Sequence, residues 1–169
     1  MKVAILGYSG CGKSTLAKYI SNYYKIPLLY LDTVMFKENW KARDKNQAIE
    51  IVSEFMKNES WVIDGNYTNF LQSKRLEEAD YIIYMKFSRL NCLFRVLKRY
   101  FKYKNASRES VSKGCIEKLD LEFIWWVIYS GRTKEKVKHY NNILFKYKEK
   151  TIIIKNQKEL NKFMKTLFN

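Results

Sequence analysis

Five short runs of apolar residues recur along the chain, and each is about as long as one β-strand. The runs are Lys2–Leu6, Leu28–Leu31, Trp61–Asp64, Tyr81–Lys86 and Thr151–Ile154. They lack the strict alternation of apolar and polar residues that marks a half-exposed strand, so they are typical of strands covered on both faces of a parallel sheet. We therefore predict a five-stranded parallel sheet.

Helical periodicity fills the stretches between these runs. Two sets of apolar residues follow the i, i+3, i+4 spacing of one helix face: Ala48, Ile51, Val52, Phe55 and Met56, and then Leu160, Phe163, Met164 and Leu167. Strands that alternate with helices predict an α/β fold of three layers, with helices on both faces of the sheet.

The stretch between the fourth and fifth runs is too long for one crossover helix, because roughly 60 residues separate them. Ser88 can cap a helix that extends to about Lys104, and Asn105–Gly114 is polar without an apolar period. A second helix follows, with an apolar face between Phe123 and Ile128. We predict a helical lid insertion at about residues 88–147 that could move, within a single domain of residues 1–169.

Directly after the first strand, residues 7–15 are GYSGCGKST, which matches the phosphate-binding pattern G-x-x-x-x-G-K-S/T. In such a loop, backbone amides surround a phosphate, glycines permit its close approach, and the following helix adds its N-terminal dipole. Lys13 is expected to neutralise the β- and γ-phosphate oxygens, and the Ser14 hydroxyl to coordinate Mg²⁺. The predicted ATP site comprises Gly7, Ser9, Gly10, Cys11, Gly12, Lys13, Ser14 and Thr15. A thiol near a helix N-terminus can have a lowered pKa, so a redox role for Cys11 is an alternative to a plain loop position.

Two aspartates stand where predicted strands end. Asp64 closes the apolar run from Trp61 and leads into Gly65, and Asp32 follows the run from Leu28. Ligands of open α/β sheets bind beyond the carboxyl ends of the strands, so both carboxylates should converge on the phosphate-binding loop. Asp64 is expected to hold Mg²⁺ through water, and Asp32 to orient an acceptor or act as a general base. A helix cap or a turn is the alternative for Asp32.

Composition narrows the class of protein. The 169 residues suffice for one domain with its own core, and the formal net charge is +15, with 25 Lys among the 32 basic residues. Dispersed lysines are typical of an exposed surface; an anionic small molecule and a nucleic acid are the alternatives. Three widely spaced cysteines and one His form neither a disulfide framework nor a zinc site. The longest apolar run, Phe123–Tyr129, is too short to cross a bilayer, and the N-terminal apolar run is too short for a secretory signal. We expect a cytoplasmic protein without a membrane partner.

Together these motifs resemble the nucleoside-monophosphate-kinase-like branch of P-loop kinases, which includes adenylate kinase and shikimate kinase. The sequence is most similar to the DNA topology modulation, FlaR-related proteins. That likeness rests on the loop of residues 7–15, Leu31-Asp32, residues 61–67, Ala79-Asp80, and Gly114–Glu117 ahead of Phe123 and Trp126. It implies a five-stranded parallel sheet and a mobile lid that closes over ATP. Asn66-Tyr67 replaces the Pro-Arg of adenylate kinases, and Asp32 lacks the Asp-x-Asp of shikimate kinases.

Arginines cluster in the predicted lid. Arg95 and Arg99 lie one turn apart on its first helix, and kinases of this type use such arginines to contact the transferring phosphate. Arg132, beyond the polar loop, could close onto the same phosphates, since guanidinium groups suit the charge on phosphoryl oxygens. A solvated basic surface is the alternative for all three. The remaining expectations concern other residues: surface positions for Arg89 and Arg108, an acceptor anion or the helix surface for Arg75, an acceptor pocket for Trp40, base stacking or core packing for Trp125 and Trp126, and a salt bridge to a lid arginine for Glu117.

The sequence thus predicts an ATP- and Mg²⁺-dependent phosphotransferase, a monomer or homodimer, that acts on an anionic or hydroxyl-bearing small molecule. Lys13, Asp32, Asp64, Arg95, Arg99 and Arg132 are its predicted catalytic residues, with Ser14 and Asp64 at the metal. Two other classes stay open: a nucleic-acid-binding regulator with ATP as a switch, and a stand-alone nucleotide hydrolase.

Overall fold

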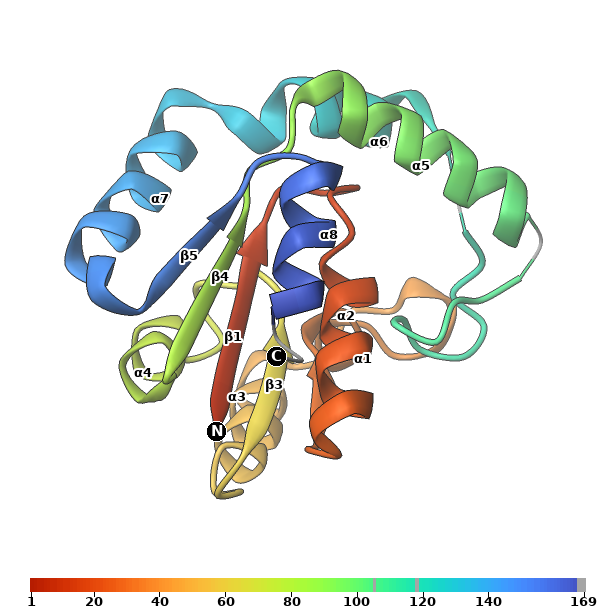
Figure 1. The fold of residues 1–169 in the computed structure, drawn as a ribbon. Helices are drawn as coiled ribbons and strands as arrows, with labels where there is room; N and C mark the ends of the chain where they lie inside the picture. Colours follow the sequence, from red (N-terminus) through yellow and green to blue (C-terminus); the bar gives the residue numbers. More distant parts are fainter. Residues whose placement is uncertain (105, 118, 167–169) are drawn as a thin grey trace.

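The computed structural model describes residues 1–104, 106–117 and 119–166. Its centre is a parallel sheet of five strands in the order β2-β3-β1-β4-β5 (Figure 1). The strands are β1 (Lys2–Gly7), β2 (Leu28–Tyr30), β3 (Trp61–Asp64), β4 (Tyr81–Met85) and β5 (Thr151–Ile154). Each predicted strand is confirmed to within one residue at either end.

Burial explains why the strand sequences read as continuous apolar runs. All four residues of β3 are buried, as are the last five of β1, because helices cover both faces of the central strands. The edge strand β2 is only partly buried over its first two residues.

Helices form the two outer layers. They are α1 (Lys13–Tyr24), α2 (Leu31–Met35), α3 (Lys45–Phe55), α4 (Gln72–Glu78), α5 (Arg89–Tyr103), α6 (Leu121–Ile128), α7 (Lys134–Lys146) and α8 (Gln157–Thr166), with short 3₁₀ helices at Glu38–Trp40, Ser130–Arg132 and Lys148–Lys150. Helices α1 and α8 cover one face of the sheet and α3, α4 and α7 the other, while α5 and α6 run across its carboxyl edge (Figure 1). The predicted three-layer fold is confirmed.

The helical predictions also agree with the structure. Ser88 caps α5 by accepting a hydrogen bond from the Asn91 amide at 3.3 Å. Ala48 and Val52 of α3 and Leu160 of α8 are buried as their spacing predicts, whereas Ile51 is 36% exposed. The predictions for Asn105 and Leu167 fall outside the described residues. Among the helices of the described ranges, none combines the length and apolar character needed to cross a membrane.

The strand order places the candidate residues together. From β1 the chain crosses to β2 on one side, and β4 later joins β1 on its other side, so the loops after β1, β2, β3 and β4 meet at one edge. One detail differs from the prediction: β2 ends at Tyr30, and Asp32 lies in the first turn of α2 instead of closing a strand.

Candidate active site

The loop between β1 and α1 has the shape of a phosphate cradle. Gly10 and Gly12 adopt φ angles of 80° and 96°, a region that favours glycine. A Cβ at Gly10 would lie 2.6 Å from the carbonyl oxygen of Cys92, and one at Gly12 would lie 2.9 Å from the guanidinium of Arg95. Helix α1 begins at Lys13 as predicted, and its N-cap, Gly12, makes no side-chain cap, which leaves the first amides open to an anion.

Lys13, Ser14 and Asp64 come together at the mouth of this loop. The Lys13 ammonium donates to the carbonyl of Tyr8 at 3.2 Å. Burial lowers the pKa of Lys13, but Cys11, Asp64 and Asp32 outweigh burial and hold it above its ordinary value. Burial raises the pKa of Asp64 to about 6, against the opposing effects of Lys13 and of the Ser14 hydroxyl, which hydrogen-bonds to this carboxylate.

One oxygen of Asp64 has no protein partner. Asp64 is 6% exposed, and its Oδ1 atom is buried without a hydrogen bond within the described part of the chain. A buried, unpaired carboxylate oxygen beside a serine hydroxyl is a donor set that suits a hydrated Mg²⁺ ion. The predicted metal residues Ser14 and Asp64 therefore fit that ion.

The raised pKa of Asp64 predicts how the stability of the nucleotide-free chain depends on pH. The folded state holds the Asp64 proton more tightly than the unfolded chain does, so ionisation lowers the free energy of unfolding as the pH rises from 3.8 to about 6. An Asp64→Asn variant lacks this loss and should gain stability relative to the unchanged protein across that interval. Urea unfolding at a series of pH values without Mg²⁺ measures the difference. A difference that stays constant across the interval would contradict the raised pKa.

The turn after β3 joins the phosphate-binding loop to the acceptor side. The Gly7 amide donates to Asn66 Oδ1 at 3.0 Å, and Asn66 Nδ2 donates to the Gly7 carbonyl at 2.7 Å. The next residue, Tyr67, donates its hydroxyl proton to Asp32 Oδ1 at 2.8 Å. Asp32 is thereby held beside Asp64, as the convergence of strand ends predicts.

Arg75 holds the turn at residues 65–70 in place through hydrogen bonds to its backbone. Its side chain is fully buried, and it donates to the carbonyls of Phe70 at 2.8 Å, Tyr67 at 2.9 Å and Gly65 at 3.4 Å. Burial lowers the pKa of Arg75 to about 10, so it stays charged at neutral pH. Neither sequence-based alternative for Arg75 was correct, because the guanidinium caps backbone carbonyls inside the protein.

Replacing Arg75 with methionine should lower the free energy of unfolding by about 3 kcal/mol or more, because buried carbonyls lose their donors. Lys74, the adjacent residue on α4, has a side chain that is 56% exposed. Lys74→Met is therefore the matched control and should change stability by less than about 0.5 kcal/mol. Chemical denaturation measures both, and equal effects of the two substitutions would show that the carbonyl contacts of Arg75 contribute little.

Arg95 and Arg132 both lie against the phosphate-binding loop. Arg95 donates to the Cys11 carbonyl at 3.3 Å, hydrogen-bonds to Gln157, and lies 4.5 Å from the centre of the Phe87 ring. Arg132 donates to the Phe87 carbonyl at 2.9 Å and to Cys92 Sγ at 3.1 Å, with its guanidinium 3.7 Å from the centre of the Tyr8 ring. Their contact with a transferring phosphate stays a prediction.

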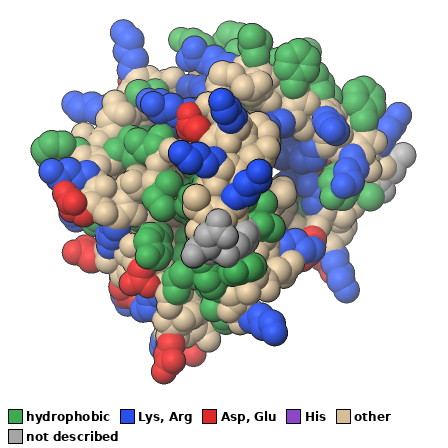
Figure 2. Space-filling model, in the orientation of Figure 1, with side chains coloured by type: hydrophobic (Ala, Val, Ile, Leu, Met, Phe, Trp, Pro, Cys, Tyr) green, Lys and Arg blue, Asp and Glu red, His purple; other side chains and the backbone are tan. Residues whose placement is uncertain are grey.

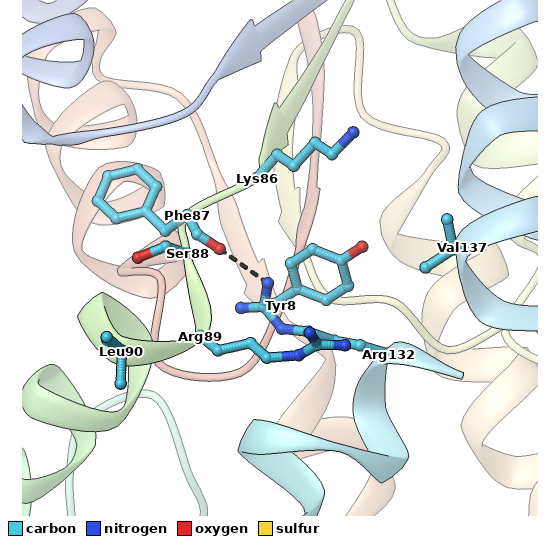
Figure 3. Close-up of a pocket in the computed structure, with 8 residues that line it drawn as sticks. All are labelled: Tyr8, Lys86, Phe87, Ser88, Arg89, Leu90, Arg132 and Val137. Carbon is cyan, nitrogen blue, oxygen red and sulfur yellow. Dashed lines mark hydrogen bonds between the residues drawn. The ribbon is translucent and has the colours of Figure 1, made fainter. Parts of the chain in front are cut away.

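A cavity of about 490 Å³ opens beside this loop (Figure 3). It is lined by Tyr8, Lys86, Phe87, Ser88, Arg89, Leu90, Arg132 and Val137. Three of these side chains are cationic and none is acidic, and Arg132 already donates to the Phe87 carbonyl and to Cys92.

Arg99 lies instead against Glu117, near Asp32. It forms a salt bridge of 2.6 Å with Glu117, which forms a second one of 2.6 Å with Arg108. The Glu117 side chain is 3% exposed and those of Arg99 and Arg108 are 22% and 13% exposed, so a buried carboxylate is paired with two partly buried arginines. Glu117 pairs with a lid arginine as predicted, whereas the surface position predicted for Arg108 was wrong. Burial and the charge of Arg108 lower the pKa of Arg99, while Glu117 and Asp32 raise it.

The polar segment 106–117 packs against the segment after β2. Cys115 Sγ donates to the Lys37 carbonyl at 3.3 Å, and Ser112 Oγ donates to the Phe36 carbonyl. The Trp40 indole donates to the Ile116 carbonyl at 2.9 Å. Segments 33–41 and 106–117 thus pack against each other, and the acceptor pocket expected at Trp40 stays a prediction.

Two other expectations can be compared with the structure. Cys11 is fully buried, and burial raises its pKa to about 11, so the thiol is protonated and a redox role is contradicted. Trp125 and Trp126 are 58% and 43% exposed, so neither packs in the core. The Trp126 indole donates to Ser9 Oγ at 3.3 Å, and the Lys136 ammonium lies 3.6 Å from the centre of its ring. Base stacking by either residue stays a prediction.

Comparison with known proteins agrees with this architecture. Structural comparison matches the chain to a deoxyadenosine kinase from M. mycoides with bound dCTP, over 99% of this chain and 98% of that one, at a TM-score of 0.52 and 17% identity. The two proteins share a fold, a five-stranded parallel sheet with helices on both faces. No protein-family model matches the chain, and comparison with curated proteins gives no match.

Sequence reasoning expected the turn from Asp64 to Tyr67 at the acceptor, but it did not predict the side-chain partners within the site. Asn66 hydrogen-bonds to Gly7, and Tyr67 hydrogen-bonds to Asp32. The one sequence feature that pointed to these two residues was their position directly after Asp64-Gly65. Arg108 had no local signal, because its partner Glu117 comes from the other end of the same loop.

Proposed function

We propose that this protein is an ATP-dependent kinase that transfers the γ-phosphoryl group to a hydroxyl of a small molecule. The observation that carries the proposal is the buried, unpaired Asp64 oxygen beside Ser14 and Lys13, at the mouth of a glycine-lined loop. In a purely structural turn, a buried carboxylate oxygen would have a hydrogen-bond donor. The water molecules of a hydrated metal ion bound to a nucleotide would supply such donors.

The donor side follows from this arrangement. The amides of the loop and Lys13 would bind the β- and γ-phosphates, Ser14 would ligate the metal, and Asp64 would orient its water molecules. Bound Mg²⁺ supplies neutralisation of the charge that develops on the phosphate oxygens. Arg95 donates to the Cys11 carbonyl of the loop, and its positively charged guanidinium would help to stabilise the negative charge on the phosphate oxygens.

The acceptor side favours a hydroxyl over a phosphate. An acceptor phosphate requires arginines that are free to bind it, but the described arginines on this side already have protein partners. Arg43 donates to the carbonyls of Val34 and Thr33, Arg75 to three carbonyls, and Arg99 and Arg108 pair with Glu117. What this side offers is Asp32, oriented by Tyr67, which is placed to accept a proton from an attacking hydroxyl.

A nucleoside is the acceptor class that we propose. The deoxyadenosine kinase that shares the fold is named for a nucleoside substrate. The sequence likeness to FlaR-related proteins rests on motifs and adds no reaction to this proposal.

Thermal unfolding with ligands tests the proposal. We expect a non-hydrolysable ATP analogue with Mg²⁺ to raise the melting temperature, and one nucleoside to raise it further. A further rise with a nucleoside monophosphate instead would overturn the hydroxyl acceptor. ATP turnover independent of any acceptor would indicate a hydrolase, and salt-sensitive DNA binding that survives Lys13→Ala would indicate a regulator.

A further inference from the structure

Helices α5 and α6 present large apolar side chains to the outside. Leu90, Phe94 and Phe101 of α5 are 68%, 67% and 73% exposed, Leu121 and Trp125 of α6 are 84% and 58% exposed, and Tyr129, the C-cap of α6, is 58% exposed. Their spacings of four and seven residues keep each set on one side of its helix. We call these six side chains the outer apolar face.

The two sets lie on neighbouring helices. Helices α5 and α6 contact each other and cross the carboxyl edge of the sheet together (Figure 1). Their inward sides hold Cys92, Val96 and Val127, which are buried, so the exposed sets point away from the core. Along the top of Figure 2, apolar side chains alternate with basic ones. Exposed apolar side chains gathered on one side of a molecule mark interaction sites on otherwise polar proteins.

Charge decides which partner suits this face. The exposed basic residues on and just after α5 are Arg89, Lys98, Lys102 and Lys104, because Arg95 donates to the Cys11 carbonyl and Arg99 pairs with Glu117. The start of α6 adds only two acidic residues, Asp120 and Glu122, so the face as a whole is basic. Lys98 and Lys102 are exposed beside the apolar side chains of α5. A second copy would bring two such basic helices together, in a chain whose net charge is already +15. An anionic partner is therefore favoured over self-association.

The kind of side chain decides between anionic partners. Leu90, Phe94, Phe101 and Leu121 need an apolar medium, which a nucleic acid backbone does not provide. Aromatic and aliphatic residues on one side of a helix, flanked by lysines, are the pattern of helices that lie in the headgroup region of a membrane. We propose that the outer apolar face docks on the surface of an anionic lipid bilayer. This inference is independent of the proposed reaction, and it replaces the expectation of no membrane partner with surface binding that does not span the bilayer.

Vesicle sedimentation with the full chain tests the proposal. We expect binding to vesicles of phosphatidylcholine and phosphatidylglycerol in equal amounts, little binding to phosphatidylcholine alone, and weaker binding as salt concentration rises. The double substitution Phe94→Ser, Phe101→Ser should weaken binding at least about tenfold. Lys98→Glu with Lys102→Glu should weaken it by about tenfold or more.

Phe145→Ser is the matched control, because Phe145 is 85% exposed near the C-terminal end of α7, away from this face. It should leave vesicle binding unchanged, and all of these exposed substitutions should leave the melting temperature unchanged. If the Phe94→Ser, Phe101→Ser variant still bound the vesicles, binding would depend on charge alone, and the proposal would be overturned. No binding to anionic vesicles, or a dimer in analytical ultracentrifugation that this double substitution dissociates, would overturn it as well.

Discussion

Replacing Lys13 with alanine is expected to lower phosphoryl transfer by about 10³-fold and to weaken ATP binding, because the β- and γ-phosphates lose the cation in their cradle. The fold should survive, since glycine backbone geometry sets the loop and the Lys13 ammonium donates to one carbonyl of that same loop. Isothermal titration with an ATP analogue and a coupled assay for ADP measure the two effects.

Lys57 provides the matched control for this substitution. Its side chain is 70% exposed and pairs with Glu54, remote from the loop. Lys57→Ala should change neither ATP affinity nor turnover. An unchanged ATP affinity in Lys13→Ala would remove the phosphate-binding role from the loop, and with it the proposed function.

Replacing Asp32 with asparagine should lower transfer to a hydroxyl acceptor by about 10²- to 10⁴-fold, the usual contribution of a general base. Asparagine keeps the shape of the side chain and can still accept a hydrogen bond from Tyr67, but it cannot take up a proton. ATP affinity should change little, because Asp32 lies on the acceptor side. The turnover number and the ATP affinity, measured on the same preparation, separate these effects.

Tyr67→Phe gives an internal comparison for Asp32. It removes the 2.8 Å hydrogen bond that orients the carboxylate but keeps the carboxylate itself. Its loss of turnover should therefore be smaller than that of Asp32→Asn. A turnover number that Asp32→Asn leaves intact would mean that the acceptor presents a phosphate oxygen, which needs no base.

Local sequence patterns were sufficient for the fold and for the shape of the loop at residues 7–15. Strand runs such as Trp61–Asp64 are apolar because both sheet faces are covered, so burial is visible in the sequence itself. The phosphate-binding loop is equally local, since its glycines and Lys13 act within nine consecutive residues.

The acceptor side could not be predicted in the same way, because its contacts join distant parts of the chain. Tyr67 and Asp32 are 35 residues apart, and the indole of Trp40 reaches a carbonyl 76 residues further on. Arg75 has the sequence environment of an exposed helix position, and only the tertiary placement of the turn at residues 65–70 makes it a buried donor.

The strand order also has a consequence for how the chain folds during synthesis. The central strand β1 is made first, but Lys2 pairs with Trp61, 59 residues later, and Val3 pairs with Tyr81. At a synthesis rate of about 5–20 residues per second, β1 waits roughly 3–12 s for its first neighbour. During that time its apolar residues have no sheet to join, and the turn that tethers Gly7 through Asn66 does not yet exist. The nascent chain therefore depends on late, non-local pairing, which makes folding slow and leaves its N-terminal segment a target for chaperones.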